Sequence, residues 1–199
     1  GRRGRVTHAL GKIEGFVKNN WNVVVISGSG LKSFVSQLPE KYQESIEVIE
    51  MESPLKGRLL AEIRWLKLLN KRIMDLVKRR SDIEVFLIRY AVSRAPFLPF
   101  LAKRLVRYEV LPVLELHGLL YYQHDWGSPL DRLILRIETH LVSYFKLIQV
   151  VSEQHKEDLQ SVGCNSEILF LPNASTLRDD PPGLRERSSN KIRRFVYLG

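Results

Sequence analysis

The feature that most constrains this chain is the short apolar run over residues 110–118, VLPVLELHG, which ends abruptly in His117 and Gly118. A run of this length, apolar at nearly every position, predicts a strand buried on both faces, as in a parallel sheet covered by helices. In an open α/β sheet the ligand crevice lies just beyond the carboxyl ends of the strands. A histidine there can hydrogen-bond a ligand, and a glycine lets the backbone come close to it. On this stretch alone, a strand followed by a turn in which His117 is merely exposed is the favoured interpretation.

Strand-like and helix-like segments alternate along the whole sequence. Apolar, β-branched runs predict strands, and apolar residues at helical spacing predict helices between them. The predicted strands cover residues 21–27, 46–51, 82–89, 110–116, 146–151, 167–171 and 194–198, and the predicted helices cover residues 7–20, 31–37, 59–80, 95–106, 131–144 and 152–161. This alternation predicts an α/β protein with a doubly wound, Rossmann-like parallel sheet.

The sequence changes character at residue 177. Residues 177–191, LRDDPPGLRERSSNK, are polar and rich in proline, which is typical of a linker, and a strand-like FVYL follows them. We therefore expect residues 1–176 to form one domain, residues 177–191 to be an interdomain linker, and residues 192–199 to begin a second domain. Because the chain opens on Gly1 and stops directly after that strand, we also expect it to be a piece of a longer protein.

Composition narrows the classes of function. The 199 residues are 44% hydrophobic, as in a globular protein, and carry a formal net charge of +9. No apolar run is long enough to span a bilayer, and no signal peptide is visible. Cys164 is the only cysteine, so an internal disulfide is excluded and a reducing, cytoplasmic compartment fits. The positive charge suits anionic partners such as nucleic acid, anionic lipid or phosphorylated ligands.

Much of this positive charge lies in and just before the predicted helix 59–80. From Lys56 to Arg80 there are nine basic and two acidic residues, and the helix also has a broad apolar face. A packed helix with a solvated basic face is the simpler interpretation, and a peripheral contact with an anionic membrane surface is the sharper one. The residues that would meet such a membrane are Arg64, Lys67, Lys71 and Arg72. A non-enzymatic nucleic-acid-binding module is an alternative, although no helix-turn-helix, zinc finger or stacking-aromatic motif accompanies the charge.

Two weaker patterns suggest other chemistry. Residues 28–33, GSGLKS, and Glu50 about twenty residues later resemble the dinucleotide fingerprint of an oxidoreductase, but Ser33 replaces its third glycine. A metal site is suggested by His117, His124, Asp125, Glu138 and His140. Glu138 and His140 are two residues apart, however, and so point to different sides of a helix. We therefore expect no metal.

Several of these segments, in their order and spacing, resemble glycosyltransferases. The segments are Gly4 followed by His8, the strand ending in His117-Gly118, residues 150–174 (VVSEQHKEDLQSVGCNSEILFLPNA), the linker, and the final FVYLG. Together they look like the amino-terminal, acceptor-side half of a GT-B glycosyltransferase, and within that fold they are most similar to glycosyltransferase family 4. The resemblance implies retaining transfer of a hexosyl group from a nucleotide-sugar donor to a lipid-linked or polysaccharide acceptor, with no metal or other cofactor.

The resemblance also implies roles for individual residues. Gly4 matches the second of two family glycines that meet the donor diphosphate, and Arg3 stands where the first would be. His117 matches the histidine that contacts the transferred sugar near the reaction centre, and it is the expected catalytic residue. Loops at this edge of a sheet commonly carry ligand contacts, so we expect the aromatic loop at residues 119–127 to contribute to the sugar and acceptor site. The expected sugar and acceptor contacts are Gly118, His8, Tyr122 and His124.

The chain departs from the family pattern in three places. Ala174 follows Pro172-Asn173 where the family usually has glycine. In the family a strand precedes the glycine loop, and a nucleotide-binding domain follows the linker. This chain starts after the position of that strand, and it ends within the first strand of the nucleotide-binding domain. We therefore expect it to be inactive alone.

Overall fold

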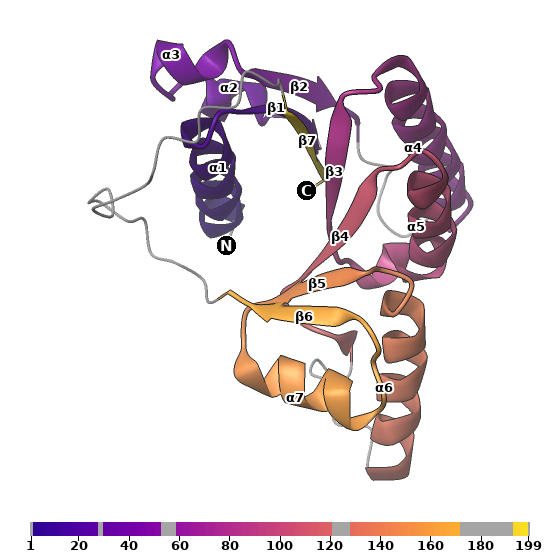
Figure 1. Ribbon diagram of the computed structural model, residues 1–199. Helices are drawn as coiled ribbons and strands as arrows, with labels where there is room; N and C mark the ends of the chain where they lie inside the picture. The colour runs from indigo at the N-terminus through magenta and orange to yellow at the C-terminus, as the bar shows by residue number, and fades with distance from the viewer. Residues whose placement is uncertain (1, 28–29, 53–58, 121–127, 172–192, 199) are drawn as a thin grey trace.

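The computed structural model describes residues 2–27, 30–52, 59–120, 128–171 and 193–198 (Figure 1). Within these ranges one sheet of seven strands has the order β2-β1-β7-β3-β4-β5-β6, and every neighbouring pair is parallel. The strands are β1 (Trp21–Ser27), β2 (Ile46–Glu50), β3 (Ile83–Arg89), β4 (Leu111–Leu116), β5 (Leu147–Val150), β6 (Glu167–Phe170) and β7 (Arg193–Leu198). The predicted α/β class and Rossmann-like parallel sheet are confirmed.

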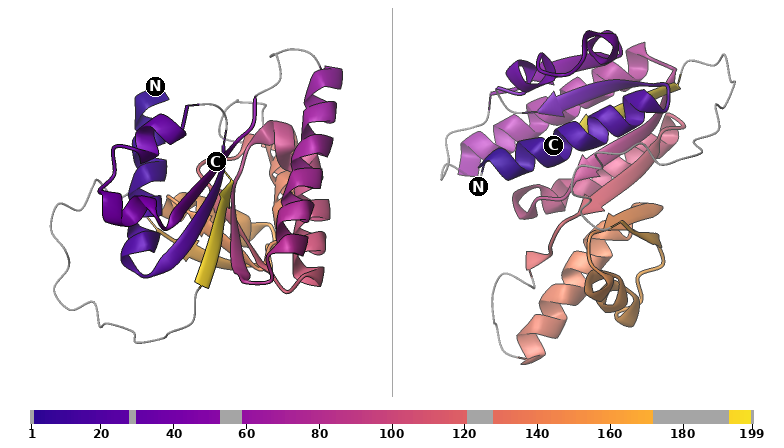
Figure 2. Two further views of the ribbon diagram at one scale, coloured as in Figure 1. Left: turned by 90° about the horizontal axis from the view of Figure 1, so that it is seen from above. Right: turned by 90° about the vertical axis from the view of Figure 1, so that its left-hand side faces the viewer.

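Helices cover both faces of this sheet. α1 and the short α2 and α3 lie on one face of the β2-β1-β7-β3 half, and α4 and α5 lie on the other (Figure 2). α6 continues the α4 and α5 side, and α7 packs on β5 and β6 (Figure 1). The helices are α1 (Arg2–Lys18), α2 (Lys32–Val35), α3 (Glu40–Gln43), α4 (Leu59–Arg79), α5 (Leu98–Arg107), α6 (Ser128–Val142) and α7 (Glu153–Ser161), with the 3-10 helix η1 (Val92–Phe97) before α5.

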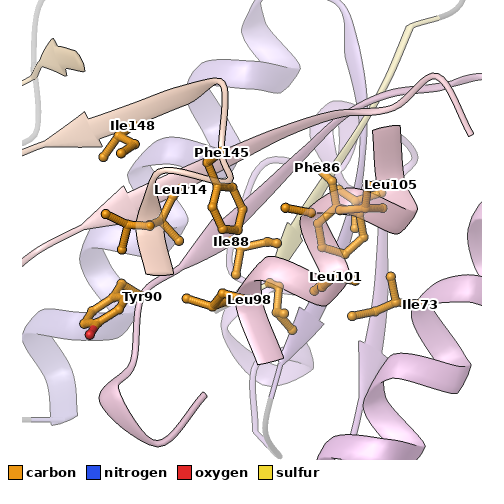
Figure 3. Close-up of a cluster of buried hydrophobic side chains, with 14 of the residues drawn as sticks. Ile73, Phe86, Ile88, Tyr90, Leu98, Leu101, Leu105, Leu114, Phe145 and Ile148 are labelled. Carbon is orange, nitrogen blue, oxygen red and sulfur yellow. The ribbon is translucent and has the colours of Figure 1, made fainter. Parts of the chain in front are cut away.

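Each central strand contributes to two hydrophobic cores because successive side chains point to opposite faces of a sheet. In β1, Val23 and Val25 belong to the core under α1, whereas Val24 and Ile26 belong to the core under α4 and α5. Figure 3 shows the second core, where Phe86 and other side chains of the sheet meet those of the covering helices. Strands apolar at consecutive positions therefore fill both layers, as the run in β4 predicts.

The structure departs from the predicted domain boundary at β7. Residues 192–199 were expected to begin a second domain, but β7 lies in the middle of the single sheet, hydrogen-bonded to β1 and β3. The physical reason is its pattern: Phe195 and Tyr197 are buried in the α1-side core, and Val196 and Leu198 are buried in the opposite core. A strand apolar on both faces is stabilised most where helices cover both faces. The predicted linker, residues 177–191, lies outside the described residues.

The first helix also begins earlier than predicted. α1 starts at Arg2 rather than at Thr7, so Gly4 lies inside the first turns of a helix and not in a loop before it. Arginine favours helix nearly as well as alanine, which offsets the cost of one glycine near the helix start. α1 ends at Lys18, and Asn20 follows in the left-handed region with a φ of 62°, a conformation in which asparagine is enriched.

Prolines set the boundaries of two other helices. The predicted helix 95–106 is instead η1 followed by α5, with Pro96 inside η1 and Pro99 in the first turn of α5, where a missing N–H costs little. α6 begins at Ser128, just before Pro129. None of the helices in the described ranges combines the length and the apolar character that crossing a bilayer requires.

Candidate functional site

Charged side chains converge at the carboxyl ends of the central strands, on the face that α1 covers. Arg89 is the last residue of β3 and is paired in register with Glu115 of β4. Tyr197 is the next-to-last residue of β7, and Lys12 of α1 pairs with Glu115 from the covering helix. Because all the strands are parallel, these residues meet at the edge where α/β sheets bind ligands. We call Lys12, Arg89, Glu115, His117 and Tyr197 the Glu115 cluster.

Glu115 is the centre of this cluster. Its side chain is 0% exposed, the Lys12 Nζ atom lies 2.9 Å from its Oε1 atom, and the same oxygen is hydrogen-bonded to His117 Nε2. Burial by itself would raise the pKa of the Glu115 carboxyl. The hydrogen bond with His117 and the charge of Lys12 outweigh burial and hold this pKa at about 2. Glu115 is therefore a carboxylate throughout the neutral range.

The other members of the cluster make it electropositive. Burial lowers the pKa of Lys12, and the paired Glu115 carboxylate opposes that shift. Burial and the Glu115 carboxylate raise the pKa of Tyr197 to about 12, so its hydroxyl stays protonated. Two cationic side chains, Lys12 and Arg89, thus accompany one carboxylate. Such an excess of positive charge at the edge of the sheet suits an anionic ligand group.

His117 is a half-buried member of the cluster that a ligand can reach. It directly follows β4, and 21% of its side chain is exposed, in contrast to the fully buried Glu115 beneath it. Next to it, a methyl group added to Gly118 would meet no atom within 4 Å, so the backbone borders open space. His155 of α7 is near enough for the charge of His117 to lower its pKa, although burial lowers that pKa more.

The other predicted site residues have mixed positions. Gly4, His8 and Lys12 follow one another at four-residue spacing in α1, so these positions share one side of that helix. Arg3 lies in the first turn of the same helix. Tyr122 and His124, like Asp125, lie outside the described residues.

Two acidic residues that suggested other chemistry have structural partners. Glu138 of α6 is buried, and its Oε1 atom accepts hydrogen bonds from Tyr90 Oη at 2.5 Å and from the Leu120 N–H at 2.8 Å. It thereby ties the segment after His117 to α6. Glu50, the expected ribose-binding acid of the dinucleotide pattern, accepts hydrogen bonds from the N–H groups of Gly30 and Lys32 at 3.0 and 2.9 Å. Within the part of the chain that the structure describes, no group of three His, Cys, Asp or Glu side chains could hold a metal ion.

A second notable region is the outer surface of α4, α5 and α6, which lie along the same side of the molecule (Figure 1). Each of these helices exposes apolar side chains among basic ones, for example Leu60 at 72% and Phe100 at 54% exposure. We call this surface the basic face. Its exposed basic residues are Arg64, Lys67, Lys71, Arg72, Lys78, Arg79, Lys103, Arg107, Arg132 and Arg136, and its exposed apolar residues are Leu60, Leu68, Phe100, Val106, Leu130, Leu133 and Ile137.

The comparisons with known proteins leave the family open. A scan of the sequence against models of protein families finds no match, and a search of curated proteins finds none either.

Sequence reasoning missed four of the five members of the Glu115 cluster. One signal was available: Glu115 is a lone carboxylate inside an apolar strand, and burying such a charge is costly unless a cation or several donors pair with it. The partners themselves come from α1, β3 and β7, so no local pattern could identify them.

Proposed function

We propose that this chain is the acceptor-side domain of a GT-B glycosyltransferase resembling family 4. The proposed reaction is retaining transfer of a hexosyl group from a nucleotide-sugar donor to a lipid-linked or polysaccharide acceptor. The observation that carries the proposal is the Glu115 cluster, because it joins cationic side chains and a reachable histidine at the carboxyl edge of a parallel sheet. A nucleotide-sugar presents both of the groups that such a cluster can bind, a diphosphate and sugar hydroxyls.

In this proposal the residues have separate tasks. Lys12 and Arg89 make the edge attractive to the negatively charged donor. His117 contacts the sugar, where its imidazole can hydrogen-bond a hydroxyl and stabilise positive charge that develops in a transition state resembling an oxocarbenium ion. Glu115 holds the His117 ring in one orientation through the hydrogen bond to Nε2, as carboxylates commonly do for functional histidines. Glu138 supports the same segment from below through the Leu120 N–H.

The proposal also includes a peripheral position on an anionic membrane, where lipid-linked acceptors occur. The basic face supports it: exposed leucine and phenylalanine side chains stand among lysine and arginine on three adjacent helices. A surface of this kind can insert its apolar groups between lipids while its cations meet the headgroups. Nucleic acid is the second candidate partner, favoured by the net charge of +9. Exposed aliphatic side chains contribute little to contacts with phosphates, so the mixed composition favours lipid.

Two measurements test the proposal. A panel of UDP-, GDP- and ADP-sugars is titrated against the chain, and transfer of sugar to washed membranes is followed by mass spectrometry with a longer protein that also carries the nucleotide-binding domain. We expect at least one donor to bind, and we expect His117→Ala to weaken that binding. If no donor binds the folded protein and no sugar is transferred, the proposal is wrong. Titration with anionic liposomes and with DNA at the same salt concentration separates the two candidate partners.

A further inference from the structure

β6 forms one edge of the sheet, and among the described residues its only neighbouring strand is β5 (Figure 1). The outer side of an edge strand presents backbone N–H and C=O groups that are not paired within the sheet, so another strand can add there. The opposite edge is formed by β2. The side chains that accompany these backbone groups differ between the two edges.

The edge at β2 is charged, whereas the edge at β6 is apolar. β2 carries Glu47, which pairs with Arg80, and Glu50, whose carboxylate accepts hydrogen bonds from the N–H groups of residues 30 and 32. Charged side chains on an edge strand oppose its pairing with other chains. Residues 168–171 carry no charge, and three exposed apolar side chains follow one another there, namely Leu169 (40%), Phe170 (37%) and Leu171 (49%). The β6 edge is therefore the one suited to accept a further strand.

The hydrogen bonds between β5 and β6 show which backbone groups point outward. The N–H groups of Glu167 and Leu171 donate to backbone carbonyls of the β5 segment at 3.0 and 2.9 Å. In a strand, the N–H and C=O groups of successive residues point to alternate sides. Residues 167, 169 and 171 therefore face β5, and Ile168 and Phe170 direct their N–H and C=O groups away from the sheet.

This pattern of outward groups is complementary to itself. If two copies of β6 lie antiparallel about a two-fold axis at Leu169, Ile168 of each copy stands opposite Phe170 of the other. Opposite residues whose N–H and C=O groups both point into the gap exchange two hydrogen bonds. Every outward backbone group of Ile168 and Phe170 then has a partner. Because both copies use the same patch, such an interface closes at a dimer.

The side chains at this edge match in the same arrangement. Leu169 is paired in register with Gln149, which is paired with Glu115, so Leu169 lies on the same face of the sheet as Glu115. α7 packs on the other face, where its Leu159 belongs to the core under α4 and α5. Two copies joined at Leu169 would bring these leucines together on the axis, with Leu171 on the same face beside them. Side chains in that type of opposite pair are in closest contact, and their apolar surface leaves water.

We propose that two copies of this chain associate through β6, with the strands antiparallel about a two-fold axis at Leu169. The two sheets then continue into one another. A second copy supplies outward groups in matching register, and its residues 168–171 bring no charge that would repel the first copy. The contact is one short strand wide, so the dimer is weak and depends on concentration. This interface does not depend on the glycosyltransferase proposal, because strand pairing requires neither donor nor acceptor.

The first test measures the mass of the whole 199-residue chain by sedimentation velocity from about 1 μM to about 500 μM, the range of weak association. We expect a shift from monomer to dimer that ends at the dimer. A chain that stays monomeric over this range would overturn the proposal. Growth beyond the dimer would also overturn it, because a two-fold strand pair leaves no further copy of this edge open.

Charge swaps at the axis test the register. Leu169→Lys and Leu169→Glu each place two like charges opposite one another, so each should weaken the dimer about tenfold or more. An equimolar mixture of the two variants should recover dimer, because opposite charges then meet. Leu111→Lys, at an exposed position on the same face at the start of β4, is the matched control and should leave the dimer unchanged. Failure of the mixture to recover dimer would refute an axis at Leu169.

A backbone variant tests the strand pairing itself. Phe170→Pro removes an outward N–H group and leaves the hydrogen bonds to β5 in place, as proline on an edge strand does. We expect this variant to stay monomeric with a melting temperature close to that of the monomeric parent. If the folded Phe170→Pro variant dimerises as the parent does, the copies do not associate through the β6 backbone.

Discussion

Two charged side chains on opposite faces of the same sheet have different surroundings. Glu115 is fully buried and pairs with Lys12 and His117, so its charge is compensated within the protein. Arg94 lies in an apolar pocket and has no carboxylate partner in the described residues. The first arrangement keeps a reachable histidine in place, whereas in the second the guanidinium lies against the Trp65 ring. The partners of a charged side chain, more than its charge alone, therefore indicate what it does in the protein.

The largest expected effect comes from removing the compensated charge. Glu115→Gln leaves the partly buried Lys12 cation without its carboxylate, so we expect a loss of about 3–5 kcal/mol in the free energy of unfolding. Urea denaturation measures it. Combining Glu115→Leu with Lys12→Met should restore most of the loss, because a packed apolar pair replaces an ion pair at little cost. If the single Glu115→Gln variant were as stable as the parent, the Lys12 cation would not depend on the Glu115 carboxylate for its compensation.

Acid should have a smaller effect on the same cluster. The pKa of Glu115 is about 2 in the folded protein, below the ordinary value of 4.5, so its charge stabilises the fold fully above about pH 4.5. That contribution is lost as the pH falls from 4.5 toward 2. We expect the unfolding free energy of the parent to decline more steeply over this interval than that of the Glu115→Leu, Lys12→Met double variant. Parallel pH curves for the two proteins would contradict this.

His117 tests the functional side of the cluster. In a preparation that shows the proposed transferase activity, His117→Ala should lower turnover by ~10²-fold, the scale of losing one well-placed transition-state donor. Its melting temperature should fall only slightly, because Lys12 still pairs with Glu115 and a single lost hydrogen bond costs about 1 kcal/mol. Turnover and melting are measured on one preparation. Normal turnover in the folded variant removes His117 from the mechanism.

The smallest effect is expected on the basic face. Replacing Arg64, Lys67 and Lys71 by glutamine should weaken binding to anionic liposomes at least tenfold, since each cation near such a surface contributes ~1 kcal/mol. The matched control replaces Lys18, Lys32 and Lys41 by glutamine. These substitutions remove the same amount of charge from the opposite side of the molecule. Equal losses in the two variants would mean that only net charge matters, and no loss in the first would exclude the face.

Much of the fold follows from local patterns in the sequence, whereas the candidate site does not. Consecutive apolar residues predict strands such as β3 and β4 because a strand that is buried on both faces is apolar at nearly every position. The position of β7 could not be predicted, because its partners Trp21 and Ile83 are far away in sequence and only pairing in space selects them. His117 was found because it ends a strand at the ligand edge. Lys12 and Arg89 were missed because an isolated basic residue in a helix or at a strand end looks like any solvated cation.

The central position of β7 has a consequence for how the chain acquires its structure. β1 and β3 are joined only through β7, so the middle of the sheet cannot close until residues 193–198 have left the ribosome. Until then the facing edges of β1 and β3 present unpaired N–H and C=O groups on apolar strands, which is the kind of edge that pairs with other chains. Contacts between such distant segments also slow folding. The nascent protein should therefore depend on chaperones until β7 has emerged and be prone to aggregate if translation stops before β7.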